Sequence, residues 1–473
     1  MGARTDGLPP EMRREVESFL DDQRVTHDIP GLSVAVLDRD DLLLTRGMGA
    51  RDVESRAPAT PDTLYSIASV TKPFTAVAIM QLVDRGDLAL DDEIREYVDF
   101  WNDVPGDPIT VHDLLSHSSG MPDDYAGTRQ LLFNDALPTS PLVTRADEIR
   151  HANSAADRRI TDHDRLMYSN RGYGILGEIL ETVSDQTHTE YVESNIFEPL
   201  GMDRSQVGYG EISETAEDSI TGYTIEDGEP VATDHDLQAE MRPPFAAGGI
   251  LSSVTEVATL VRCLLNDGEL DGERLLDADL VAAMASGQAP EVERLGGQRA
   301  GYGYGLRVSD FLGERYVDHS GSAPGVSRAY VGYLPQRGIG VTLAVNTTGV
   351  PIYAFGKGVL AIVAGEVPES VVPYLSLQAK IDAVTGVYDG YRGSPTMTVR
   401  PGNGGHVVLS YRDVPDWDLP AFPASIGHDD YTFHVIRENG VREPVRFRRT
   451  ESGMELLFNT DRLDRIATEA PKE

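Results

Sequence analysis

The stretch Ser69-Val70-Thr71-Lys72 decides how this chain is interpreted, because it sets a hydroxyl three positions before an amine. Residues three apart share one face of a helix, so a helix that begins near Ser69 would bring Oγ and Nζ into contact range. A serine hydroxyl is a poor nucleophile until a base takes its proton, and a lysine held neutral can be that base. Pro73 suits the first turn of such a helix. The pattern predicts a nucleophilic serine; the alternative is a surface lysine near a helix start.

Apolar residues recur at helical spacing after this motif, which predicts a helical middle region. The expected helices are 73–85, 110–117, 172–184, 189–197 and 254–266. Strand-like runs lie on both sides of this region, at 31–37, 42–48, 328–334 and 339–345. We therefore expect an α/β (α+β) domain over residues 1–365, in which helices and a helical region accompany an antiparallel sheet closed by both ends of the domain.

The sequence changes character after Gly365. Residues 366–378 contain Pro368 and Pro373 and predict a linker. From residue 379 to 473, short alternating segments between glycine-rich turns predict a small all-β domain, most simply a barrel. The expected strands are 384–388, 396–399, 406–411, 431–436, 441–448 and 454–458.

The charge balance excludes several kinds of partner. The 473 residues carry 77 acidic and 41 basic side chains, a formal net charge of −36. Such a surface repels nucleic acid and anionic membranes, so we expect neither as a partner. Acidic residues along the whole chain, with Arg strongly replacing Lys, indicate a halophilic protein whose self-repulsion is screened by molar salt. An ordinary acidic protein is the alternative.

The lack of long apolar segments in the sequence predicts the cellular compartment of the protein. No apolar run approaches the roughly 20 residues that span a bilayer, and the charged first segment has no apolar middle of a secretory signal. We expect a soluble, cytoplasmic protein. The single cysteine, Cys263, excludes an intramolecular disulfide and lies in an apolar helical run, so a core position is expected.

Two further motifs supply groups that could serve the serine. In Tyr168-Ser169-Asn170, the tyrosine oxygen can relay a proton and the amide can orient a lysine and a substrate carbonyl. In His319-Ser320-Gly321-Ser322, a cationic or donor side chain, a hydroxyl and a glycine that admits a substrate line one strand edge. Backbone N–H groups of Ser69 and Ser322 would form an oxyanion hole. Each of these motifs alone is most simply structural.

The order Ser-x-x-Lys, Tyr-x-Asn, His-Ser-Gly resembles the serine β-lactamase and penicillin-binding DD-peptidase-like superfamily, and within it the class C-like branch of peptidases and esterases. The resemblance covers roughly residues 8 to 365 and includes the segment His112–Gly120. It implies the β-lactamase/transpeptidase-like fold. The segment after residue 378 resembles the lipocalin-like barrels of some archaeal members, which implies a homo-oligomer built through that domain.

The resemblance also implies roles for individual residues. Ser69 would be the acylated nucleophile, Lys72 the proton acceptor, and Tyr168 the group that passes protons to the leaving group and activates the deacylating water. Substrate would be bound by a set of polar or small residues: Asn170, His319, Ser320 and Gly321.

His319 stands where most β-lactamases carry lysine, which favours a peptidase or amidase on short peptides, including those with D-residues. A carboxylesterase is the second reading and a β-lactamase the third, since all three classes would use the same residues. From another class, the chain could be a non-catalytic penicillin-binding-like sensor or binding protein. A small peptide, amide or ester is the expected substrate in the catalytic readings.

Other motifs predict no cofactor and no metal. Gly172–Gly177 fits the dinucleotide-binding glycine pattern, but no hydrophobic strand precedes it. His112 and His117 lack the four-residue spacing of zinc proteases and are expected to hydrogen-bond locally. Gly301–Gly305 is expected to be a tightly packed strand entry and not a phosphate cradle. Three C-terminal histidines leave a minor metal alternative: His406, His428 and His434.

Overall fold

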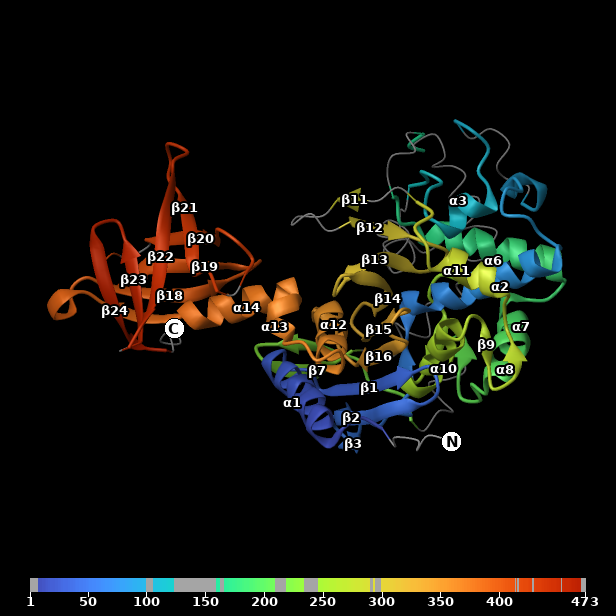
Figure 1. Ribbon diagram of the computed structural model, residues 1–473, viewed down its shortest axis with the longest axis horizontal. Helices are drawn as coiled ribbons and strands as arrows, with labels where there is room; N and C mark the ends of the chain where they lie inside the picture. The colour runs from blue at the N-terminus through green and yellow to red at the C-terminus, as the bar shows by residue number, and fades with distance from the viewer. Residues whose placement is uncertain are drawn as a thin grey trace, which may run out of the picture. The chain divides into compact units, whose positions relative to one another are not determined.

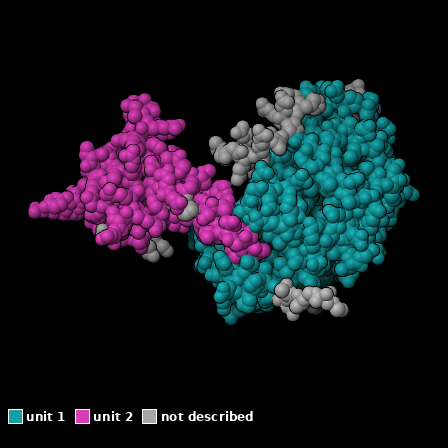
Figure 2. Space-filling model, viewed as in Figure 1, with its two compact units in different colours: residues 1–360 teal, residues 361–473 magenta. Residues whose placement is uncertain are grey.

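The computed structural model divides the chain into two compact units, residues 1–360 and 361–473 (Figures 1 and 2). Each unit has a hydrophobic core of its own. The described residues are 7–98, 105–122, 159–161, 166–208, 218–233, 246–289, 292–293, 299–412, 414, 417–427, 429–451 and 453–468.

In the described part of the first unit, a 9-stranded antiparallel sheet runs in the order β11-β12-β13-β14-β15-β16-β1-β2-β3. The first and last strands of the unit meet inside this sheet, since Leu32 of β1 pairs with Val345 of β16. The predicted antiparallel sheet closed by both ends of the domain is therefore confirmed. Its strands are β1 (Gly31–Asp38), β2 (Leu42–Asp52), β3 (Ala57–Pro58), β11 (Val292–Glu293), β12 (Arg299–Tyr302), β13 (Arg307–Phe311), β14 (Glu314–Ala323), β15 (Ser327–Leu334) and β16 (Ile339–Val345).

Helices cover both faces of the sheet (Figure 1). Helix α10 lies on one face, where Thr342 of β16 donates to the carbonyl of Val254 at 2.7 Å. Helices α1 and α12 lie on the other face, where Gly356 of α12 packs directly on the ring of Tyr330. The helices are α1 (Pro10–Thr26), α2 (Thr71–Arg85), α3 (Val111–Leu115), α6 (Asn170–Ser184), α7 (His188–Val192), α8 (Glu198–Leu200), α10 (Val254–Leu265), α11 (Ala278–Met284) and α12 (Ile352–Val363).

Helix α2 is buried along most of its length. Every residue from Thr71 to Met80 is buried, so the helix is enclosed on all sides instead of presenting one apolar stripe. It ends at Gly86, whose φ of 75° is the left-handed conformation that terminates many helices. A 3-10 turn, η1 (Ala68–Val70), leads into it. The residues at the start of α2 are thus fixed by packing.

The second unit contains a closed eight-stranded barrel, as predicted. Its interior is filled by side chains: Val399, Leu409 and Phe433 are fully buried there, and Val384 of helix α14 (Pro373–Val384) packs on the same cluster. The described interior is therefore a packed core. The strands are β17 (Gly386–Asp389), β18 (Thr396–Gly402), β19 (His406–Tyr411), β20 (Asp418–Pro423), β21 (Thr432–Ile436), β22 (Arg442–Thr450), β23 (Gly453–Phe458) and β24 (Asp461–Ala467).

The segment 366–378, predicted to be a linker, contains helix α13 (Pro368–Val371) and the first part of α14 (Pro373–Val384). The two prolines that suggested a linker stand in the first turns of these helices, where a missing N–H leaves no intrahelical bond unmade. Proline here marks helix starts. Among the helices of the described residues, none is long and apolar enough to span a membrane.

Candidate active site

Ser69 lies in a turn whose backbone is strained just before it. It is the middle residue of η1, directly before α2, so its side chain stands at the N-terminal end of that buried helix. Ala68 has a φ of 46°, a left-handed conformation that costs an L-residue with a Cβ roughly 1–2 kcal/mol. Such strain persists where the surrounding structure fixes a functional side chain.

Lys72 is fully buried, and its amine contacts three oxygens. Nζ lies 3.1 Å from Oγ of Ser69, 2.7 Å from Oδ1 of Asn170 and 2.8 Å from the carbonyl oxygen of Ala247. These contacts orient the amine at the hydroxyl. The structure thus brings together the two groups that the sequence spacing pairs.

Tyr168 and Asn170 come from the start of α6. Ser169 caps this helix by accepting a hydrogen bond from the N–H of Gly172 at 3.1 Å, which makes Asn170 the first helical residue. The ring of Tyr168 lies 4.8 Å from Nζ of Lys72, and the side chain is 38% exposed. Tyr168 therefore faces the amine on one side and solvent on the other.

Residues 319–322 occupy successive positions of β14, beside the turn that carries Ser69. A Cβ at Gly321 would lie 2.0 Å from the carbonyl oxygen of Ile67 and 2.9 Å from the backbone nitrogen of Ser69. Glycine is therefore required for the strand to approach the turn so closely.

One edge of this part of β14 has no partner strand among the described residues. The β13 ladder ends where Arg307 pairs with Asp318, whereas β15 pairs with β14 as far as Ala323. Backbone groups after Asp318 therefore face the Ser69 side without a ladder, and Ser322 itself is exposed. An extended substrate could pair with this edge.

Ser320 points away from His319, because neighbouring strand residues face opposite sides of the sheet. Its Oγ donates to Oη of Tyr353 on α12 at 2.6 Å. Arg307 also bonds this tyrosine oxygen and forms an ion pair with Asp318 at 3.0 Å. His319 and Ser320 thus belong to different side-chain networks.

His319 is a buried, neutral histidine. Burial lowers its pKa well below the ordinary 6.5, and the positive charge of Arg307 lowers it further. Its Nδ1 lies 2.9 Å from the carbonyl oxygen of Ser320, which can only accept, so Nδ1 carries the proton. Nε2 then accepts from Oη of Tyr302 at 2.9 Å. Of the two alternatives that the sequence left open for His319, a cationic or a donor side chain, burial favours the neutral donor.

Sequence reasoning missed an aromatic group around the site. The ring of His117 lies 4.4 Å from that of Tyr168, 4.5 Å from that of Tyr302 and 5.1 Å from that of Tyr173. The Nζ of Lys72 lies 5.4 Å from the ring of Tyr173. Lys72 is therefore enclosed by rings as well as by its hydrogen-bond partners.

The glycine repeat Gly301–Gly305 is the sequence feature that could have predicted a place for Tyr302 at the site. A Cβ at Gly305, whose φ is 75°, would lie 2.9 Å from the carbonyl oxygen of Lys72. The repeat packs against the start of α2, which confirms the expected close packing and brings Tyr302 of β12 to the site.

The prediction that the side chains of His112 and His117 hydrogen-bond to nearby residues of the sequence is wrong. Nδ1 of His112 lies 2.8 Å from Oη of Tyr304, and Nδ1 of His117 accepts from the N–H of Ser169 at 3.1 Å. Both bonds join segments far apart in the sequence, which no local pattern reveals.

The remaining candidate motifs do not form sites in the described residues. Gly172–Gly177 lies inside α6 and forms no phosphate loop. Cys263 is buried, as predicted, and burial raises the pKa of its thiol to about 12. No group of three or more His, Cys, Asp or Glu side chains in the described part of the chain could hold a metal, and His428 lies outside that part.

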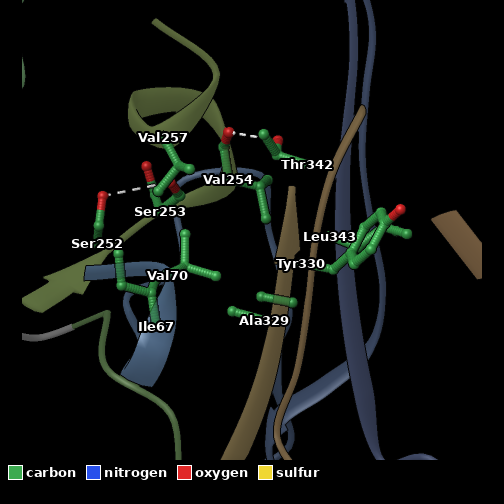
Figure 3. A pocket seen from close by; sticks show the side chains of 11 residues that line it. Ile67, Val70, Ser252, Ser253, Val254, Val257, Ala329, Tyr330, Thr342 and Leu343 are labelled. Carbon is green, nitrogen blue, oxygen red and sulfur yellow. Dashed lines mark hydrogen bonds between the residues drawn. The ribbon is translucent and has the colours of Figure 1, made fainter. Parts of the chain in front are cut away.

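A cavity behind η1 is not the substrate site (Figure 3). Its volume of about 10 Å³ is near the least that holds one water molecule, and Ser69 is not among its lining residues. Apolar side chains such as Ile67, Val70 and Ala329 dominate its wall. It is a packing gap between η1, α10 and the sheet.

Comparison with known proteins finds similar families and similar folds. Residues 13–363 match the family model described as Beta-lactamase, and residues 368–464 match the Pab87 octamerisation domain. The octameric penicillin-binding protein homologue from Pyrococcus abyssi is 32% identical, with a TM-score of 0.82 over 95% of this chain and 99% of that one. The D-amino acid amidase from Ochrobactrum anthropi is 25% identical, with a TM-score of 0.60 over 75% of this chain and 96% of that one.

Among curated relatives, Protein flp of Staphylococcus aureus (strain N315) is 26% identical over 230 residues. The match covers 48% of this chain and 44% of that protein, so this chain spans less than half the length of that relative.

Proposed function

This chain belongs to the beta-lactamase family, and on that premise we propose that it is a serine hydrolase that forms an acyl-enzyme at Ser69. The observation that carries the proposal is the 3.1 Å contact between Nζ of the buried Lys72 and Oγ of Ser69. The amine also donates to Oδ1 of Asn170 and to the carbonyl oxygen of Ala247, and these bonds hold it beside the hydroxyl. Two groups held in this way meet the geometric requirement for a base-activated nucleophile.

The reaction follows from these positions. Lys72 takes the proton of Ser69 as Oγ attacks the substrate carbonyl carbon, and the carbonyl electron pair moves onto oxygen. Backbone N–H groups of Ser69 and Ser322 donate to this oxyanion. Tyr168, beside Lys72 and partly open to solvent, passes the proton to the leaving group. Water activated through the same pair then hydrolyses the ester of Ser69 and restores both groups.

For the substrate, we favour the amide bond of a short peptide, including peptides with D-residues. The edge of β14 after Asp318, which has no partner strand in the part of the chain that the structure describes, suits an extended peptide backbone that would pair with it as a further strand. The neutral His319 gives no positive charge at the place where most β-lactamases carry a lysine. The D-amino acid amidase among the similar structures supports the same choice. Esterase activity is the second choice and β-lactamase activity the third. A sensor without turnover is the alternative from another class.

A substrate panel tests this choice. Purified full-length protein in molar potassium chloride would be given matched D- and L-aminoacyl p-nitroanilides, short peptides, p-nitrophenyl butyrate and nitrocefin, with Ser69→Ala as the control. We expect amide hydrolysis that the control lacks. Turnover of nitrocefin or the ester alone would contradict the peptidase choice, and no turnover of any substrate would favour the sensor.

We also infer that copies of this chain associate through the barrel, because residues 368–464 match an octamerisation domain and a 32% identical homologue is octameric. One outer face of the barrel supports this. The ring of His406 stacks on Phe422 at 5.2 Å, and Phe422 pairs with His434 on the next strand. Phe422 is 45% exposed and Ile436 56% exposed. We call this the Phe422 face; it consists of His406, Pro420, Phe422, His434, Ile436 and Pro444.

A charge placed on this face should break the assembly. Phe422→Glu would bring carboxylates together wherever two such faces meet, and we expect smaller species in light scattering after size exclusion. Ile466→Glu is the matched control, because Ile466 is 59% exposed on β24, which lies four strands from β20 in the closed eight-strand order. An unchanged mass for Phe422→Glu would contradict the assignment of this face.

A further inference from the structure

His117 holds the backbone on both sides of Tyr168. Its carbonyl oxygen accepts from the N–H of Met167 at 3.0 Å, and its Nδ1 accepts from the N–H of Ser169 at 3.1 Å. A single residue thus bonds both neighbours of the tyrosine. The segment that carries Tyr168 therefore takes its position from His117 as much as from α6.

The imidazole also contacts the ring of Tyr168. The two ring centroids are 4.4 Å apart, and His117 has no exposed surface. Tyr173 and Tyr302 enclose the imidazole on other sides. Tyr168 is 38% exposed, so contacts on its buried side must fix its ring. His117 supplies the shortest ring contact on that side among the described residues.

The protonation of His117 suits this role. Nδ1 can accept from a backbone N–H only when unprotonated, so the proton of the neutral ring is on Nε2. Burial lowers the pKa of His117 well below 6.5, which keeps the ring neutral. Nε2 is buried without a hydrogen-bond partner among the described residues.

The backbone of His117 is set by the end of helix α3. Its φ of 58° is the left-handed conformation that terminates many helices, and the N–H of Ser118 donates to the carbonyl oxygen of Asp113 at 2.9 Å across this turn. The turn fixes His117 directly after α3, where its carbonyl oxygen and its Nδ1 accept from residues 167 and 169.

We propose that His117 is a positioning residue that holds Tyr168 at the Ser69–Lys72 pair. This inference rests on the proposed function, in which Tyr168 moves protons to and from the reacting groups. His117 touches no reacting atom itself, because its Nδ1 is occupied by Ser169.

Two variants separate the bonding role from the ring contact. In His117→Asn, the side-chain Oδ1 stands near the position of Nδ1 and can still accept from Ser169, but the ring is lost. In His117→Phe, the ring remains and the acceptor is lost. If the acceptor positions Tyr168, His117→Phe should lower kcat about 10- to 100-fold with little change in KM, and His117→Asn should retain most activity.

A double-mutant cycle tests whether the effect passes through Tyr168. In a Tyr168→Phe background, His117→Phe should cost less than about threefold, since the group that it positions is already gone. Equal losses in both backgrounds, or wild-type kcat in His117→Phe, would overturn the proposal. So would a Tyr168→Phe variant as active as the wild type.

A readout that needs no turnover distinguishes failure of this inference from failure of the proposed function. Deuterium uptake of the peptide that covers residues 166–173, measured by mass spectrometry on the full chain, reports the N–H of Ser169. We expect slow uptake in wild type and His117→Asn, and faster uptake in His117→Phe. Unchanged uptake in His117→Phe overturns the proposal even if Ser69 proves unreactive. If uptake is faster in His117→Phe but Ser69 is unreactive, the contact between His117 and Ser169 is correct and the proposed function is wrong. That result would overturn the catalytic role proposed for His117.

Discussion

Replacing Gly321 with alanine should damage the site at a single backbone contact. The added Cβ would lie 2.0 Å from the carbonyl oxygen of Ile67, whereas close carbon–oxygen contacts are about 3.3 Å. The strand and the turn that carries Ser69 must then separate by more than about 1 Å. Misplacement by about 1 Å can reduce a rate about 100-fold, so we expect a loss of that size in the acylation rate.

The same clash should lower stability, because backbone on both sides resists displacement. Overpacking of this kind costs about 1–3 kcal/mol in the free energy of unfolding. Gly174→Ala is the matched control: it lies in α6, and a Cβ there meets nothing within 4 Å. Since alanine favours helix over glycine, the control should gain up to about 1 kcal/mol and keep its activity.

The assay compares the two variants with the wild type in molar potassium chloride. The acylation rate would be taken from the loss of free Ser69 with a fluorophosphonate, and the free energy of unfolding from urea titration followed by fluorescence. Gly321→Ala with a wild-type rate and unchanged stability would refute the claim that β14 and the Ser69 turn are in obligatory contact. A rate loss of equal size in Gly174→Ala would show that the assay does not report this contact.

Three further predictions concern the catalytic pair, salt and pH. Ser69→Ala and Lys72→Ala should each abolish turnover, because the two groups act as one unit. The double variant should then be scarcely less active than either single variant. Additive losses in log kcat would contradict this. The melting temperature should rise strongly between low and molar potassium chloride, because a net charge of −36 repels itself until screened; a constant value would refute the halophile reading. Burial holds the folded-state pKa values of His117 and His319 well below 6.5, so the unfolded chain binds protons there that the folded protein excludes. The free energy of unfolding should therefore be fully retained above pH 6.5 and should decrease as the pH falls below it. Unfolding at fixed salt from pH 8 to 5 should show His117→Asn to be less acid-sensitive than wild type, and parallel curves would contradict it.

Periodicity and motif spacing predicted most of the fold. The two hairpins that close the sheet, at 31–37 with 42–48 and at 328–334 with 339–345, appear as β1, β2, β15 and β16. Three of these strands, β1, β15 and β16, are mostly buried apolar runs, for which local pattern and tertiary packing agree. The Ser69–Lys72 spacing succeeded for the same reason, since one helical turn sets both side chains on one face.

Two barrel strands escaped prediction because their sequences do not look like strands. β20 contains Pro420 and Pro423, and in β24 only Leu463 is buried between charged neighbours. Closure of the barrel pairs both segments with neighbouring strands, although their local sequence patterns do not predict strands. Tertiary context overrides propensity in such cases.

The aromatic group around Lys72 could not be predicted for a different reason. His117, Tyr173 and Tyr302 come from three segments that lie far apart in the sequence and meet only in the folded domain. Burial, which makes His319 neutral, is equally invisible before the domain is assembled. Sequence reasoning found the residues that share a motif and missed those that share only a location.

The most direct test of the central claim is labelling of the intact protein with a fluorophosphonate, followed by intact mass and peptide mapping. We predict one adduct per chain, located on Ser69, with labelling lost in Ser69→Ala and strongly slowed in Lys72→Ala. The absence of an adduct under conditions where the protein is folded, or an adduct on a different serine, would contradict the claim that Lys72 activates Ser69.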